Sequence, residues 1–185
     1  MKELLKLTME IINLDDITRN IRSAKDELMT CCNGIADELF FHQPVEKWSI
    51  AQNVRHLVIS HNKTRMAYML PKFILGWVIG KANRKSKTYE ELVNKYEMKL
   101  QQGGRASGPF IPENIPGNYG KVKILNEFAK STSRLENSIE KKWTDPQLDK
   151  FIAPHPLLGK ITMRELGFFT IHHIHHHLRI IRDRL

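Results

Sequence analysis

Residues 162–185 read TMRELGFFTIHHIHHHLRIIRDRL. Thr162, followed three residues later by Glu165, forms the capping-box pattern that marks the start of a helix. Beyond it, apolar residues recur at the period of an α-helix, about 100° per residue. The apolar face consists of Gly167, Ile171, Ile174, Leu178, Ile181 and Leu185. This stretch therefore predicts a long amphipathic helix that buries one side against the rest of the protein.

Five of the nine histidines lie in this helix, within six consecutive positions. On the helical wheel, His173 and His177 fall beside the apolar face. The solvent side carries His172, His175 and His176. The inward pair is spaced by four residues, so the two imidazoles stack one turn apart and can share one metal ion. The other interpretation is a buried pair hydrogen-bonded to neighbours. Packing alone explains the pair poorly, because each unpartnered polar group costs about 1–3 kcal/mol to bury.

The rest of the chain predicts three more long helices and one short helix. Apolar spacing predicts a helix over residues 14–41 and another over residues 121–143. Ser49 and Gln52 form a capping box before a helix over residues 50–70. Thr88 and Glu91 form a further one before a short helix that ends near residue 102.

The segments between these helices indicate how they are connected. Residues 71–118 are irregular, with glycines and prolines concentrated after residue 102. So long a connection in a helical bundle suits a crossover between two helices that run in the same direction. Residues 150–160 are interpreted as a turn-rich linker, since no segment alternates convincingly as a strand does. The predicted fold is all-α: a four-helix bundle with a long crossover and a short accessory helix, in one domain over residues 1–185.

Composition narrows the partners and the compartment. The formal net charge is +9, but the cations are spread out and not interleaved with aromatics in a nucleic-acid module, so we expect no nucleic-acid partner. No apolar run reaches eighteen residues, so we expect no membrane partner. Residues 1–6 mix charges into the apolar positions and lack the core of a signal peptide. Cys31 and Cys32 are adjacent and have no third cysteine to pair with, which fits a reducing compartment, and we expect a cytoplasmic protein.

Two separated motifs resemble those of the DinB-like superfamily. The first is KWSIAQNVRHL at residues 47–57, and the second combines HPLLGKIT at residues 155–162 with HIHHHL at residues 173–178. The bacillithiol S-transferase-like proteins are similar at both motifs. The resemblance implies a zinc or nickel ion bound by His56, His173 and His177. Helical periodicity alone favours His61 over His56 as the third ligand, because His61 falls on the more apolar side of its helix.

The resemblance also implies a function. In the similar proteins the ion activates the thiol of a low-molecular-weight cofactor, which then attacks a small electrophilic substrate. A metal-dependent thiol transferase or a related hydrolase is therefore the first hypothesis, and we expect His61 and His176 to line its site. The alternative is a non-catalytic metal- or ligand-binding bundle, and DNA binding ranks third. Similar proteins often dimerise, so a homodimer is a further expectation. Residues 72–87 match no segment of the family, so the substrate stays unnamed.

Overall fold

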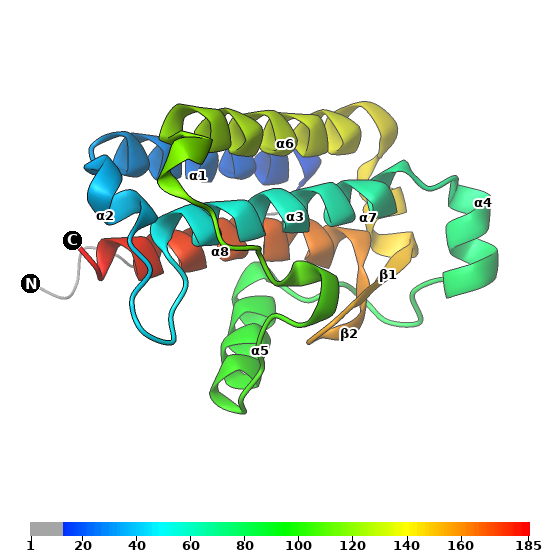
Figure 1. Cartoon of the computed structure of the whole chain (residues 1–185). Coiled ribbons are helices and arrows are strands. Elements are labelled where there is room, and N and C mark those ends of the chain that lie inside the picture. Colours follow the sequence, from blue (N-terminus) through cyan, green and yellow to red (C-terminus); the bar gives the residue numbers. More distant parts are fainter. Residues whose placement is uncertain (1–12) are drawn as a thin grey trace, which may run out of the picture.

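A computed structural model describes residues 13–185, and the expectation about residues 1–6 lies outside them. Four long helices form a bundle (Figure 1). They are α1 (Leu14–Asn33), α3 (Ile50–Met69), α6 (Lys121–Lys142) and α8 (Met163–Arg182). Helices α1 and α3 each pack against both α6 and α8, so they occupy opposite corners. The predicted all-α bundle is confirmed, and the capping boxes at Ser49, Thr88 and Thr162 all form.

Shorter elements connect and cover these four helices. They are α2 (Asp37–Phe41), α4 (Lys72–Ile74), the π-helical turn η1 (Leu75–Ile79), α5 (Tyr89–Gln101), the 3-10 turns η2 (Gly108–Phe110) and η3 (Gly117–Tyr119), and α7 (Asp145–Lys150). Figure 1 shows that α3 and α6 run in the same direction. Helix α5 follows α3 and precedes α6 in the sequence, and it lies outside the bundle. Helix α5 packs against α8. It is the accessory helix of the predicted crossover.

The prediction of one helix over residues 14–41 was wrong. The first helix ends at Asn33, where the Gly34 amide N–H donates back to the Cys32 carbonyl, and α2 begins separately at Asp37. Glycine weakens a helix by about 1 kcal/mol relative to alanine, and here it closes the last turn. The apolar period continues across the break, so periodicity alone could not locate it.

The interpretation of residues 150–160 as a linker was also wrong. They contain a small antiparallel hairpin, β1 (Ile152–His155) and β2 (Gly159–Thr162), in which His155 lies opposite Gly159. The turn is held by the His155 ring, because its Nδ1 accepts the amide N–H groups of Leu157 and Leu158 at 3.2 Å each. Gly159 supplies the left-handed backbone, at φ +74°, that the turn needs. Four-residue strands give too short an alternation to recognise in the sequence.

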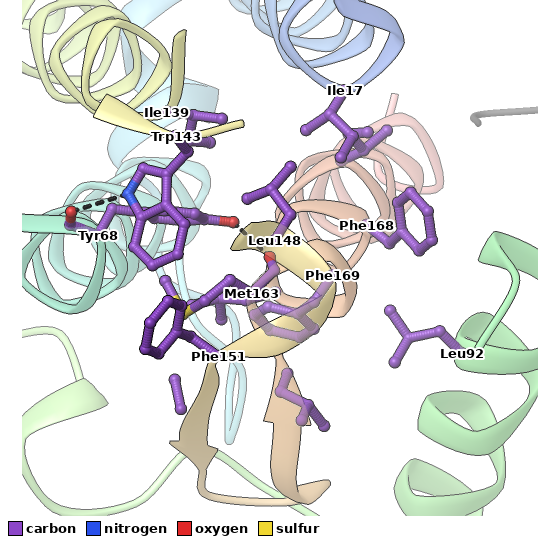
Figure 2. Close-up of a cluster of buried hydrophobic side chains, with 14 of the residues drawn as sticks. Ile17, Tyr68, Leu92, Ile139, Trp143, Leu148, Phe151, Met163, Phe168 and Phe169 are labelled. Atoms are coloured by element: carbon purple, nitrogen blue, oxygen red, sulfur yellow. Dashed lines mark hydrogen bonds between the residues drawn. The ribbon is translucent and has the colours of Figure 1, made fainter. Parts of the chain in front are cut away.

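The core consists of two apolar clusters that follow one another along the bundle. Figure 2 shows the one nearest the hairpin, where Tyr68 Oη donates to the Met163 carbonyl at 2.7 Å and Trp143 Nε1 donates to the Tyr68 carbonyl at 3.0 Å. The other cluster surrounds Phe128 and Ile174. Among residues 13–185, no helix is long and apolar enough to cross a membrane.

Candidate metal centre

Three imidazoles converge between α3 and α8. His56 Nε2 lies 3.1 Å from His173 Nε2, and His177 Nε2 lies 3.2 Å from the same atom. All three residues are buried. Imidazole nitrogens bound at 2.0–2.1 Å around a tetrahedral zinc ion are about 3.3 Å apart. The two distances from His173 Nε2 therefore match the edges of such a site, and the ligand atoms of all three residues lie within 4.8 Å of one another.

Neighbouring oxygens fix the protons of the two outer rings. His56 Nδ1 donates to the Phe110 carbonyl at 2.7 Å, and His177 Nδ1 donates to Asn53 Oδ1 at 2.8 Å. Asn53 is itself held in orientation, because its Nδ2 donates to the Ser49 carbonyl at 2.8 Å. With Nδ1 protonated, a neutral ring presents a lone pair at Nε2.

This arrangement cannot be satisfied by hydrogen bonds alone. Two lone pairs, from His56 and His177, face the single Nε2 of His173, which can carry only one proton. A divalent cation accepts all three lone pairs at once. The three imidazoles, the distances between their nitrogens and the hydrogen bonds from two of the rings to oxygen atoms therefore fit a metal ion better than a packed histidine cluster.

Burial keeps these rings in the form that binds metals. It lowers the pKa of His56, an effect that the bond to the Phe110 carbonyl partly offsets. Burial, followed by the neighbouring imidazoles, holds the pKa of His173 and of His177 well below the ordinary value. Neutral imidazole is the form that a divalent ion requires, so no proton has to leave before binding at neutral pH.

His56 lies on a face of α3 that the sequence did not identify as buried. Helical periodicity favoured His61 because the wheel reports only the side that faces the bundle core. The turn η2 covers the second side, placing the Phe110 carbonyl against His56. Trp48, just before α3, adds an aromatic wall, with its ring 5.1 Å from that of His56 and 6.5 Å from that of His177.

His61 is buried at a different place. Its Nδ1 donates to Thr132 Oγ1 at 3.0 Å, and its ring packs against Phe128. It is not among the residues lining the cavity described below. Its Nε2 has no hydrogen-bond partner among residues 13–185. Burial, assisted by the nearby His56, lowers the pKa of His61 to about 3.

The neighbouring side of α8 carries a second group, whose two histidines the helical wheel assigned to solvent. His172 is buried because α5 covers it, and its Nε2 lies 3.0 Å from Glu97 Oε1. The ligand atoms of Glu97, His172 and His176 lie close enough to share an ion. However, Arg179 already donates to Glu97 Oε1 at 3.0 Å and lies 3.3 Å from His176 Nδ1. This group is thus an ion-paired network that fastens α5 to α8.

A cavity of about 870 Å³ opens onto the three histidines. Its apolar wall includes Phe110, Leu157, Leu166, Phe169 and Ile180, and cationic residues Lys47, Lys63, Arg105 and Arg184 also line it. His176 and His155 belong to the lining as well, and burial lowers the pKa of each to about 4. A space of this size admits a drug-sized organic molecule. The three-histidine group is therefore reachable by a substrate, unlike a closed structural site.

A family model described as the DinB superfamily matches residues 20–181. This match covers most of the chain and includes all three converging histidines. Comparisons with curated proteins and with solved structures find no match.

Proposed function

This chain belongs to the DinB superfamily, and we propose that it is a metal-dependent enzyme in which His56, His173 and His177 hold one zinc or nickel ion. The observation that carries the proposal is the convergence of three imidazoles at the wall of an open cavity, where His173 Nε2 lies 3.1 Å from the Nε2 of His56 and 3.2 Å from that of His177. We further propose a thiol S-transferase of the bacillithiol type, or a related hydrolase.

The bound ion would supply Lewis acidity and lower the pKa of a thiol or water that enters the cavity. The residues of the chain would orient the ligands and shape the cavity around the ion. Asn53 and the Phe110 carbonyl hold two of the imidazoles in orientation, which keeps all three lone pairs directed at one point. The apolar residues that line the cavity would limit the water around the reacting groups.

The cavity lining also suits the proposed cofactor class. Lys47, Lys63 and Arg105 are lining residues, and a small thiol with carboxylate groups would find cationic partners there. The apolar residues of the same lining would hold an uncharged electrophile. A cavity of about 870 Å³ has room for both reactants. This supports transfer between two small molecules over the alternative of a non-catalytic bundle.

The test is metal content by mass spectrometry on untagged protein, for wild type, His173→Ala and His175→Ala. His175 is the matched control, because it is on the same helix but outside the converging group. We expect about one ion per chain in wild type, none in His173→Ala, and wild-type content in His175→Ala. Quenching of tryptophan emission by added nickel, through Trp48 beside His56 and His177, gives a second readout.

Catalysis is tested separately on the loaded protein. Bacillithiol, cysteine and glutathione are each offered with an electrophilic dye that becomes fluorescent once it has alkylated a thiol. We expect turnover with at least one thiol in wild type and in His175→Ala, and none in His173→Ala. A folded wild type that takes up neither zinc nor nickel would refute the proposal. A test ester is offered in parallel for the hydrolase. If the loaded wild type transfers none of the thiols and hydrolyses no ester, the catalytic proposal is refuted and the non-catalytic metal-binding bundle is favoured.

A further inference from the structure

The segment that follows α3 carries an apolar surface that the bundle does not cover. Phe73, Trp77 and Val78 are 72 %, 94 % and 76 % exposed, within six consecutive positions. We call these three residues the apolar tip. Figure 1 shows α4 at the edge of the molecule, projecting beyond the ends of the long helices. Large apolar side chains gathered on an exposed surface mark an interaction site more often than isolated ones do.

The apolar tip is held in this position by its own anchors. Leu75, on the other side of the same turn, is fully buried, and Ile79 packs against the core cluster shown in Figure 2. Lys160 Nζ donates to the Ile79 carbonyl at 2.9 Å, and Lys72 Nζ donates to the Lys142 carbonyl at 2.7 Å. The segment is therefore a short amphipathic turn with one side fastened to the protein and the other directed outward.

The charged residues of the segment that carries the apolar tip all have one sign. Residues 70–88 contain no aspartate or glutamate. They contain five cationic residues, Lys72, Lys81, Arg84, Lys85 and Lys87. Arg84 is paired with Glu165, whereas Lys81 and Lys85 are exposed. The surface is thus an apolar projection bordered by positive charge, which complements an anionic partner.

We propose that the apolar tip docks the protein onto the surface of an anionic lipid bilayer. Tryptophan and phenylalanine favour the boundary between headgroups and acyl chains, and neighbouring lysines are drawn to anionic headgroups. A second copy paired through the same surface would bring the five cations of each chain face to face. Docking of this kind is peripheral, so it needs no membrane-spanning helix, and it is independent of the metal centre.

The test is co-sedimentation of the full chain with vesicles. One set contains phosphatidylcholine alone, and the other contains equal parts of phosphatidylcholine and phosphatidylglycerol. We expect sedimentation only with the anionic vesicles, weakening as salt is added, together with a blue shift of tryptophan emission that Trp77→Phe removes. The double variant Phe73→Ser/Trp77→Ser should lose binding while its circular dichroism stays unchanged, since both side chains are exposed.

Charge variants separate docking by this surface from general adsorption of a basic protein. Each lysine near an anionic surface strengthens binding about fivefold, so Lys81→Gln/Lys85→Gln should weaken it about thirtyfold. Lys123→Gln/Lys130→Gln, on α6, removes the same charge elsewhere and should weaken it much less. Val122, 70 % exposed on α6, gives the matched apolar control as Val122→Ser.

Three results would overturn the proposal. The first is failure of the wild type to sediment with anionic vesicles. The second is equal sedimentation of wild type and Phe73→Ser/Trp77→Ser, which would indicate adsorption through net charge alone. The third is a lipid-free dimer that this double variant dissociates, which would assign the apolar tip to a second copy of the chain.

Discussion

Replacing His61 with leucine should make the protein less sensitive to acid. His61 is fully buried, its Nδ1 donates to Thr132, and its pKa is lowered to about 3 from the ordinary value of 6.5. The unfolded chain therefore binds this proton more readily than the folded chain does. The contribution of neutral His61 to the free energy of unfolding is fully present above the unfolded pKa of 6.5. It is lost as the pH falls toward the pKa of the folded chain. At about pH 5 the loss from this one residue is about 2 kcal/mol, because one pKa unit corresponds to about 1.36 kcal/mol.

The assay is urea unfolding of metal-free protein, followed by circular dichroism at about pH 8 and about pH 5. The free energy of unfolding of wild type should fall by about 2 kcal/mol more than that of His61→Leu between the two pH values. Thr132→Val is the control. It removes the partner of Nδ1 and should cost about 1–3 kcal/mol at both pH values. An equal fall in wild type and His61→Leu would show that His61 is not held neutral by burial, and would refute the reasoning.

Two further pairs of variants test the orientation of a metal-binding histidine and the packing of α1 against α8. Asn53→Ala removes the acceptor for His177 Nδ1 and should weaken zinc binding about 10–100-fold in a chelator competition titration, whereas Asn53→Asp keeps an acceptor oxygen and should retain most of the affinity. Unchanged affinity in Asn53→Ala would contradict the role given to this contact. Gly167→Ala would place its Cβ 2.8 Å from Ile17 Cγ2 and should cost about 1–3 kcal/mol in urea unfolding. Gly34→Ala should cost less, because its Cβ would make only an ordinary contact, 3.7 Å from the Cys31 carbonyl oxygen. A Gly167→Ala variant as stable as wild type would show that α1 can move away from α8.

The sequence located the long helices well because their ends are encoded locally. Ser49, Thr88 and Thr162 each cap a helix with a partner three residues later, and all three boxes form. The break at Gly34 and the hairpin after α7 were missed for a physical reason. Neither feature changes the periodic pattern of apolar residues in the sequence. The hairpin turn also depends on the His155 side chain, which accepts hydrogen bonds from two backbone amides.

Only part of the candidate metal site could be predicted from local sequence patterns. His173 and His177 could be found from spacing along one helix, because the wheel reports which side of α8 is apolar. His56 could not be found in this way, since its burial comes from η2, which lies more than fifty positions further along the chain. Only the resemblance of the first motif identified it. The burial of His172 was also missed, because it comes from Glu97 and α5, which lie far from His172 in the sequence and leave no local pattern around it.

The order in which the three histidines occur has a consequence for synthesis. His56 and His173 are 117 positions apart, and His177 follows in the final turns of α8. A chain emerging from the ribosome would present His56 early and would complete the set only after α5, α6 and the hairpin had been made. An ion that needs all three ligands would thus bind only after α8 has been made. Metal occupancy in the cell would then report completed chains, and a chain interrupted before α8 would remain empty.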